Sequence, residues 1–76
     1  MRVLIIDDEK SIRSSTSAAL KAEGHQGDVA DSSTVALAKL QEEAYDLAFL
    51  DLRLGDEDGL DVLPELKRSQ PNLAVV

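Results

Sequence analysis

Three aspartates carry the clearest chemical signal in this 76-residue sequence. Asp7 and Asp8 directly follow the apolar run at residues 3–6, and Asp51 directly follows the apolar run at residues 47–50. Carboxylates that share one crevice repel each other and partly neutralise unless a cation binds between them. Because the chain has no cysteine and the ligands are oxygens, a hard cation is expected, Mg²⁺ rather than Zn²⁺.

Such a metal site has an obvious chemical use. A carboxylate beside Mg²⁺ can attack phosphorus and form an acyl phosphate. The bound metal offsets the repulsion between an acidic pocket and an incoming phosphoryl group. The three acids therefore predict a pocket suited to phosphoryl transfer onto an aspartate.

The elements that must position these acids alternate along the chain. Uninterrupted apolar runs at residues 3–6, 47–50 and 73–76 predict strands buried on both faces. A short edge strand is expected within residues 25–30, where Gly27 and Asp28 oppose a central position. Three helices are predicted from apolar residues at helical spacing: Ile12, Thr16, Ala19 and Leu20; Val35, Ala36, Leu37, Leu40 and Ala44; Leu60, Leu63 and Leu66. Gly24 is expected to end the first helix, Ser32 to Thr34 are capping types, and residues 52–59 are interpreted as a loop.

This order, strand and helix in alternation, predicts an α/β fold with a parallel sheet and right-handed crossovers. In open parallel sheets, ligands bind outside the carboxyl ends of the strands, near the point where the strand order reverses. Asp7, Asp8 and Asp51 would converge there if the first and third strands are neighbours.

The composition excludes several classes of function. The formal net charge is −7, from 15 acids against 8 bases, which argues against direct binding of this segment to nucleic-acid phosphates. The longest apolar runs are far shorter than the ~20 residues that span a bilayer. The first residues do not form a signal-peptide pattern. No membrane contact and a cytoplasmic location are expected.

Three motifs carry a family resemblance. Residues 5–9, Ile-Ile-Asp-Asp-Glu, resemble the first-strand motif of response-regulator receiver domains. Residues 49–54, Phe-Leu-Asp-Leu-Arg-Leu, are similar to the phosphorylation-site strand of that family and the loop after it. Asp58, Gly59 and Leu60 match the start of its third helix. The resemblance implies a flavodoxin-like doubly wound parallel sheet, truncated to (βα)3β, with strand order 2-1-3-4.

The resemblance also implies roles for individual residues. Asp51 would be the phospho-acceptor and a metal ligand. Asp7 and Asp8 would hold Mg²⁺, Asp8 directly, and the backbone carbonyl of Arg53 would be a further ligand. The donor would be a phosphohistidine on a sensor histidine kinase, and the output, expected to be transcription, would be encoded beyond this chain. Residues 51–60 are also reminiscent of regulators of sigma-54-dependent transcription.

The resemblance has one departure and one gap. Gly55 stands where the family usually has proline, which makes this loop more flexible. The family completes its fold with two more helices and a fifth strand, so residues 1–76 are expected to be a partial receiver domain. The switch Ser/Thr and the phosphate-binding Lys of the family have no counterpart here. An exposed fourth-strand edge or an uncovered face would favour a homo-oligomer.

Three alternatives remain open at this point. A Mg²⁺-dependent aspartyl phosphatase would need a second acid two residues after its nucleophile, where this chain has Arg53. A calcium-binding loop at residues 51–59 is opposed by Leu54, which stands where the pattern needs an acid. A pseudo-receiver, a binding or dimerisation module that takes no phosphate, is opposed by Asp8 and Asp51.

Overall fold

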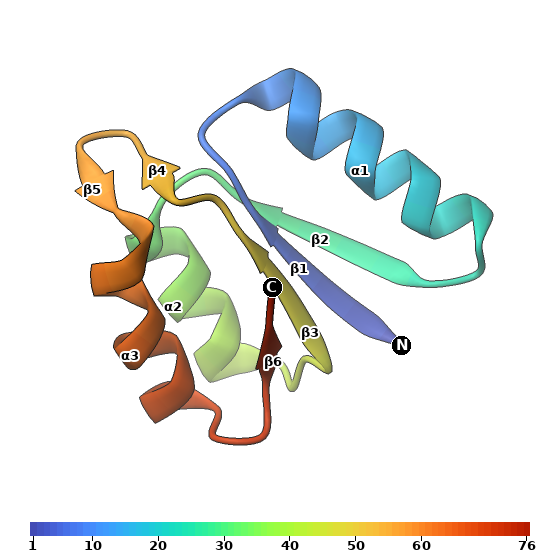
Figure 1. The fold of residues 1–76 in the computed structure, drawn as a ribbon. Coiled ribbons are helices and arrows are strands. Elements are labelled where there is room, and N and C mark those ends of the chain that lie inside the picture. Colours follow the sequence, from blue (N-terminus) through green and yellow to red (C-terminus); the bar gives the residue numbers. More distant parts are fainter.

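A computed structural model describes residues 1–76. Its helices and strands, in chain order, are β1 (Arg2–Ile6), α1 (Lys10–Ala22), β2 (Gln26–Ala30), α2 (Ser33–Glu42), β3 (Leu47–Leu50), β4 (Arg53–Leu54), β5 (Glu57–Asp58), α3 (Gly59–Ser69) and β6 (Ala74–Val75) (Figure 1). β1, β2, β3 and β6 form a parallel sheet in the order β2-β1-β3-β6. β6 is the fourth strand of this sheet in chain order, because β4 and β5 pair separately. The structure therefore confirms the predicted α/β fold and the predicted strand order 2-1-3-4.

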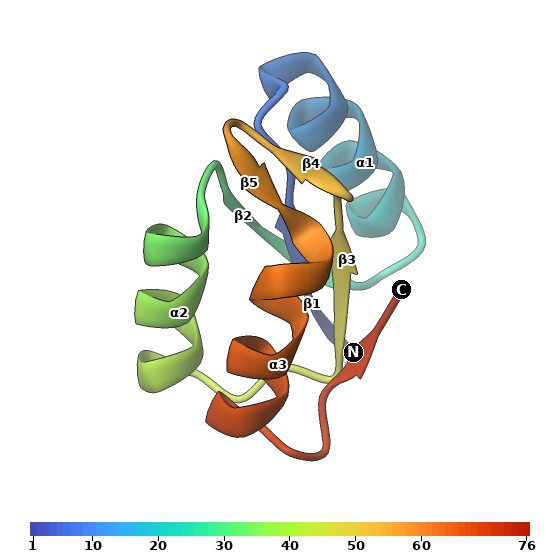
Figure 2. The same cartoon turned by 60° about the vertical axis from the view of Figure 1, so that its left-hand side comes forward.

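The sheet lies between helices on both faces (Figures 1 and 2). α1 packs on β1 and β2 from one side, and α2 and α3 lie together on the other. Side chains of a strand point alternately to its two faces, so Leu4 and Ile6 of β1 face α2 and α3, whereas Val3 and Ile5 face α1. The main core fills the side of α2 and α3, and it consists of Leu4, Ile6, Ala30, Ala36, Leu40, Tyr45, Ala48, Leu54, Val62, Leu66 and Leu73.

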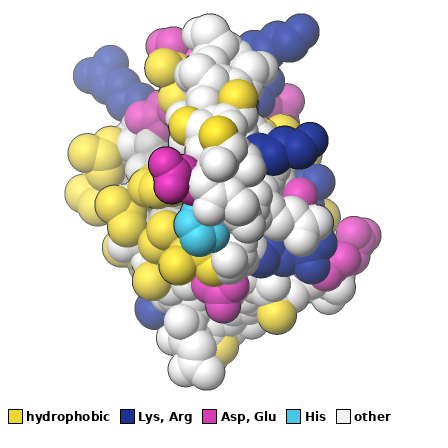
Figure 3. Space-filling model, turned by 90° about the vertical axis from the view of Figure 1, so that its right-hand side faces the viewer, with side chains coloured by type: hydrophobic (Ala, Val, Ile, Leu, Met, Phe, Trp, Pro, Cys, Tyr) yellow, Lys and Arg dark blue, Asp and Glu magenta, His cyan; other side chains and the backbone are white.

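The face on the side of α1 is covered less completely. No residue of α1 is buried, and Ile12 is 43% exposed, so the predicted apolar stripe of this helix is only partly used. A groove of about 340 Å³ lies beside it, lined by Ile5, Ile6, Asp7, Ile12, Thr16, Phe49, Leu50, Asp51 and Val76. Exposed hydrophobic side chains gather on one side of the molecule in the space-filling view (Figure 3).

Two local predictions were wrong. The segment 52–59 is not a plain loop, because β4 and β5 pair antiparallel within it, with Arg53 opposite Asp58 and Leu54 opposite Glu57. The predicted leucine stripe of α3 is wrong at Leu60, which is 61% exposed; Leu66 is buried as predicted, and Val62, which was not predicted, is buried with it. The pair Val62 and Leu66 has i, i+4 spacing, which stays on one helix face better than i, i+3, i+6.

Two helix ends were predicted correctly. Gly24 follows α1 with φ +84°, and the His25 amide donates to the Leu20 carbonyl at 2.9 Å, as in a left-handed helix ending. Ser32 precedes α2, and its Oγ accepts a hydrogen bond from the Val35 amide at 3.2 Å. This side chain satisfies one of the amides that a helix start leaves unpaired.

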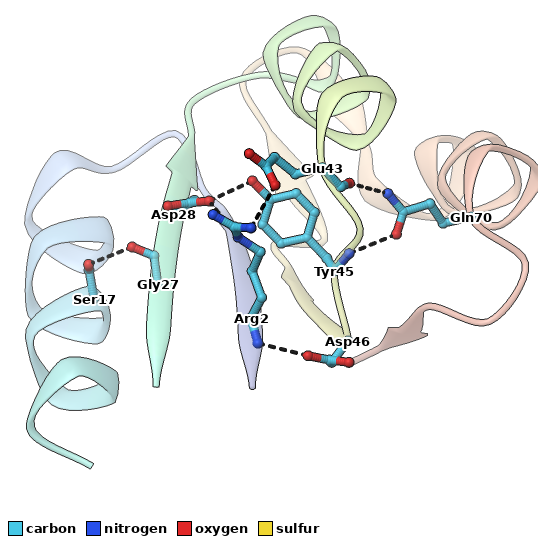
Figure 4. Close-up of polar contacts among 8 residues, drawn as sticks. All are labelled: Arg2, Ser17, Gly27, Asp28, Glu43, Tyr45, Asp46 and Gln70. Carbon is cyan, nitrogen blue, oxygen red and sulfur yellow. Dashed lines mark hydrogen bonds and ion pairs between the residues drawn. The ribbon is translucent and has the colours of Figure 1, made fainter. Parts of the chain in front are cut away.

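A polar cluster holds the sheet together near the start of β1 (Figure 4). The Tyr45 hydroxyl donates to Asp28 Oδ2 at 2.6 Å, and Arg2 pairs with Glu43 at 2.6 Å. Arg2 also lies over the Tyr45 ring, with its guanidinium carbon 5.8 Å from the ring centre. The cluster therefore joins β1, β2 and the segment between α2 and β3.

Gln70 closes the same end of the molecule on the side of α3 (Figure 4). Its Oε1 accepts from the Tyr45 amide at 3.0 Å, and its Nε2 donates to the carbonyls of Leu40 and Glu43 at 2.8 and 2.6 Å. One side chain thus satisfies backbone groups at the end of α2 and just before β3. Nothing in the sequence predicted this role.

We expect Tyr45→Phe to destabilise the protein by about 1–2 kcal/mol at neutral pH, because Asp28 then loses a hydrogen-bond donor. Burial, followed by the hydrogen bond to Asp28, raises the pKa of Tyr45 well above its usual range. The folded state therefore holds the Tyr45 proton more tightly than the unfolded state does. The stability that this hydroxyl contributes is complete below about pH 10 and declines as the pH rises further. Urea unfolding followed by circular dichroism, near pH 7 and at about pH 11, checks this. The gap between wild type and variant should narrow at the higher pH, and a constant gap would contradict the assignment.

Candidate functional site

The register of the sheet places the three aspartates at one edge. β1 and β3 are neighbours, and their last residues, Ile6 and Leu50, are opposite each other. The next residues, Asp7 and Asp51, therefore leave the sheet at the same level, and the Asp51 amide donates to the Ile6 carbonyl at 3.0 Å. The condition stated for convergence, that the first and third strands be neighbours, is met.

The carboxylates of Asp7, Asp8 and Asp51 lie together at this edge. One oxygen from each lies within 4.8 Å of the others. Asp7 and Asp51 are half-buried, and Asp8 is exposed. Bonds from Mg²⁺ to oxygen are about 2.1 Å long and octahedral, so two bound oxygens lie about 3.0 Å apart at adjacent positions and about 4.2 Å apart at opposite ones. The three oxygens can therefore reach one magnesium ion when the side chains turn inward.

Each carboxylate is held by one backbone amide. The Glu9 amide donates to Asp7 Oδ1 at 2.9 Å, and the Arg53 amide donates to Asp51 Oδ1 at 3.1 Å. The Gly55 amide donates to Asp8 Oδ2 at 3.1 Å. A single donor leaves the other oxygen of each carboxylate free for a cation or for reaction with an electrophile.

Two further residues support the site: Arg13, which the sequence did not single out, and Gly59, which it marked only as part of the third-helix motif. Arg13 Nη1 donates to the backbone carbonyl of Asp7 at 2.8 Å, which ties the start of α1 to the end of β1. Gly59 packs so closely under the turn after β3 that an added Cβ would lie 2.8 Å from Leu52 Cα and would also collide with the Asp51 carbonyl oxygen. A basic residue six positions after Asp7, and a glycine at a helix start, were the available signals.

Two of the other acids after Asp51 have structural roles. Asp58 caps α3, since its Oδ1 accepts from the Leu60 amide at 2.9 Å. Glu57 accepts a hydrogen bond from Ser33 Oγ at 2.6 Å. Asp56 and Asp61 are exposed, as expected for solvated acids. Arg53 is exposed as well, and the role of its backbone carbonyl as a metal ligand stays a prediction.

None of the helices has both the length and the apolar character that crossing a membrane requires.

The family model described as "Response regulator receiver domain" matches residues 3–76. The curated relatives include the alginate biosynthesis transcriptional regulatory protein AlgB of Pseudomonas aeruginosa, 43% identical over 99% of this chain. Another is the virulence transcriptional regulatory protein PhoP of Salmonella typhimurium, 37% identical over the whole chain. The chain spans only 17% of AlgB and 34% of PhoP.

Solved structures of receiver domains are also similar to this chain. A CheY-like receiver domain protein from Methanospirillum hungatei superposes with a TM-score of 0.92 at 32% identity, over 97% of this chain and 59% of that one. The beryllofluoride-activated NtrC4 receiver domain dimer has a TM-score of 0.90 at 37% identity, over 99% and 62%. TrrA of Thermotoga maritima, in complex with Mg²⁺ and BeF, has a TM-score of 0.87 at 32% identity, over 97% and 64%.

Proposed function

Because the chain belongs to the response regulator receiver domain family, we propose that it takes a phosphoryl group from a sensor histidine kinase onto Asp51, with Mg²⁺ as cofactor. The observation that carries this proposal is the convergence of Asp7, Asp8 and Asp51 within 4.8 Å at the carboxyl ends of adjacent strands. In this role the chain is a signalling module that is itself modified, and no turnover of a separate substrate is proposed.

The proposed reaction needs a free, ionised and correctly placed oxygen on Asp51. Its Oδ1 is held by the Arg53 amide at 3.1 Å, and its backbone is fixed to β1 through the Ile6 carbonyl, so Oδ2 remains available. An electron pair of Oδ2 forms the new bond to phosphorus while the bond from phosphorus to the histidine nitrogen breaks. The electrons of that bond return to the imidazole ring, and Asp51 becomes an acyl phosphate.

Asp7, Asp8, Asp51 and the backbone carbonyl of Arg53 are the proposed ligands of Mg²⁺. When bound, the ion would lower the repulsion between these acids and the phosphoryl oxygens. Support comes from the oxygen-only donor set, which suits a hard cation, and from the similar receiver TrrA, whose structure is a complex with Mg²⁺ and BeF. Metal ligation and phosphorylation would thus use the same crevice.

We propose further that residues 1–76 are the N-terminal part of a receiver domain that controls an output elsewhere in a longer protein. The chain spans 59% to 64% of the three superposed receiver structures. AlgB and PhoP, whose names describe transcriptional regulators, are several times longer than the matched segment. Control of transcription, in the cytoplasm, is therefore the proposed output, with DNA contacts made outside this acidic segment.

Self-association of residues 1–76 by themselves is a second proposed property. β6 pairs only with β3, and Val76 is 71% exposed. The amides of Ala74 and Val76 donate to β3 and the residue before it, so by the alternation of a parallel ladder the Val75 amide faces outward. Open edges recruit further strands, and the NtrC4 receiver domain is described as a dimer.

We expect light scattering at micromolar concentration to show dimers or larger species whose fraction rises with protein concentration. Val75→Pro removes the outward amide without removing a donor to β3, so it should shift the protein toward monomer. Val75→Thr, which keeps the amide and the strand preference, is the matched control. A wild-type protein that stays monomeric over the whole concentration range would refute the proposal.

The proposed function is tested by amide NMR spectra recorded with Mg²⁺, with beryllofluoride, and with both. We expect Mg²⁺ alone to shift the amide signals of Asp8, Asp51 and Arg53, and beryllofluoride to shift Asp51 only when Mg²⁺ is present. The variant Asp51→Asn should lose the beryllofluoride response. Equal responses with and without Mg²⁺, or a response that persists in this variant, would overturn the proposal.

A further inference from the structure

The segment from β4 to β5 forms a hairpin whose tip touches the site. We define the acidic hairpin as residues 53–58, with β4 and β5 paired antiparallel and Gly55 in the turn at φ +62°. The Gly55 amide donates to Asp8 Oδ2 at 3.1 Å, across 47 residues of sequence. This φ is unfavourable for residues with a Cβ. Glycine therefore allows the turn conformation in which the amide of residue 55 donates to Asp8.

We propose that the backbone amide of Gly55 positions Asp8 for the cation, and that cation binding in turn orders the acidic hairpin. This inference rests on the proposed function. Asp8 is exposed, and the amide of Gly55 is the only hydrogen-bond partner of its side chain in the structure. Without that bond the carboxylate would rotate freely and would lose this freedom on binding a metal.

The bond leaves Asp8 able to bind a cation. The amide occupies one position on Oδ2, while Oδ1 carries no donor and stays available. Hydrogen bonds from neighbouring groups to metal-ligating carboxylates orient them and strengthen metal binding. The Gly55 amide stands in that relation to Asp8, as the Arg53 amide does to Asp51. One hairpin thus supplies donors to two of the three acids.

The acidic hairpin also makes a hydrogen bond to α2, so cation binding at the aspartates can affect the start of that helix. Glu57 of β5 accepts from Ser33 Oγ at 2.6 Å, and Ser33 is 7% exposed at the start of α2. The hairpin therefore links the acids at the ends of β1 and β3 to the start of α2. Coupling between two parts of a protein is reciprocal. If the folded hairpin strengthens cation binding, then the bound cation must stabilise the folded hairpin.

The test compares two substitutions at one position. Gly55→D-Pro removes the amide hydrogen, and its φ of about +65°, the mirror image of that of L-proline, fits the φ of +62° at this turn. Gly55→D-Ala also accepts a positive φ and keeps the amide hydrogen, so it is the matched control; both variants are made by chemical synthesis of the chain. Mg²⁺ dissociation constants are measured from the amide signals of Asp7 and Asp51. We expect Gly55→D-Pro to weaken Mg²⁺ binding by about 10-fold or more, and Gly55→D-Ala to weaken it much less. Circular dichroism without Mg²⁺ checks that both variants are folded.

A second readout does not depend on the variants. In the wild-type protein, Mg²⁺ is expected to slow hydrogen exchange at the amides of Gly55 and Glu57, and Ser33→Ala should reduce that protection at Glu57. Equal Mg²⁺ binding by wild type, Gly55→D-Pro and Gly55→D-Ala would overturn the role of Gly55 and leave the proposed function intact. Equal weakening by both variants would also overturn it, by assigning the effect to backbone strain. A wild-type protein that binds no Mg²⁺ would instead overturn the proposed function.

Discussion

With Mg²⁺ and acetyl phosphate, Asp51→Asn is expected to lower the rate of phosphoryl uptake by roughly 1000-fold or more relative to wild type. The amide nitrogen of asparagine offers no electron pair comparable to that of a carboxylate oxygen, so no acyl phosphate forms. The fold should persist, because the asparagine oxygen can still accept the hydrogen bond from the Arg53 amide. Chromatographic separation of phosphorylated and unmodified protein over time gives the rates.

Asp61→Asn is the matched control for that experiment. Asp61 is an exposed acid in the first turn of α3, so its substitution makes the same change of charge away from the three-aspartate crevice. We expect its rate of uptake to stay within about twofold of wild type, because exposed charges at a distance are screened by salt. Comparable rates for Asp51→Asn and Asp61→Asn would remove Asp51 from its proposed role.

Gly59→Ala is expected to destabilise the protein by about 3 kcal/mol or more, which is a large share of the stability of a domain this small. The added Cβ would lie 2.8 Å from Leu52 Cα and would collide with the Asp51 carbonyl oxygen. Both neighbours are backbone atoms, so the turn after β3 must move as a unit. Because this turn carries Asp51, phosphoryl uptake should also fall.

Gly27→Ala provides the comparison for this effect. The nearest atoms to a Cβ at Gly27 are side-chain atoms of Ser17 and Leu20 at 3.4 Å, a distance that a small adjustment relieves. We expect its cost to stay below about 1 kcal/mol. Urea unfolding followed by circular dichroism measures both variants, and equal midpoints for Gly59→Ala and wild type would refute the packing argument.

The sheet and the central site could be predicted from the sequence for simple physical reasons. Uninterrupted apolar runs mark buried parallel strands, and the acids that follow them must lie at the carboxyl edge. The position of Asp7 beside Asp51 then depends only on β1 and β3 being neighbours, which the structure has. The ends of α1 and α2 were predictable because Gly24 and Ser32 act through local backbone geometry.

Features that depend on contacts distant in sequence were not predictable in this way. The hairpin of β4 and β5 was missed because its strands have two residues each, too few for an apolar pattern, and because it is fixed by contacts with Asp8 and Ser33. The leucine stripe of α3 misled at Leu60 because the buried face of that helix follows the i, i+4 pair Val62 and Leu66, which leaves Leu60 61% exposed. The bond from Tyr45 to Asp28 joins residues 17 positions apart with no local signal.

The central claim is that Asp51 accepts the phosphoryl group, and mapping the modified residue tests it most directly. The wild-type protein is treated with Mg²⁺ and acetyl phosphate, digested in the cold, and its peptides are sequenced by mass spectrometry. We predict a single phosphorylated peptide with the added mass on Asp51, and no such peptide when Mg²⁺ is removed by a chelator. A phosphoryl group found on Asp7, Asp8 or any residue other than Asp51, or its uptake without Mg²⁺, would contradict the account.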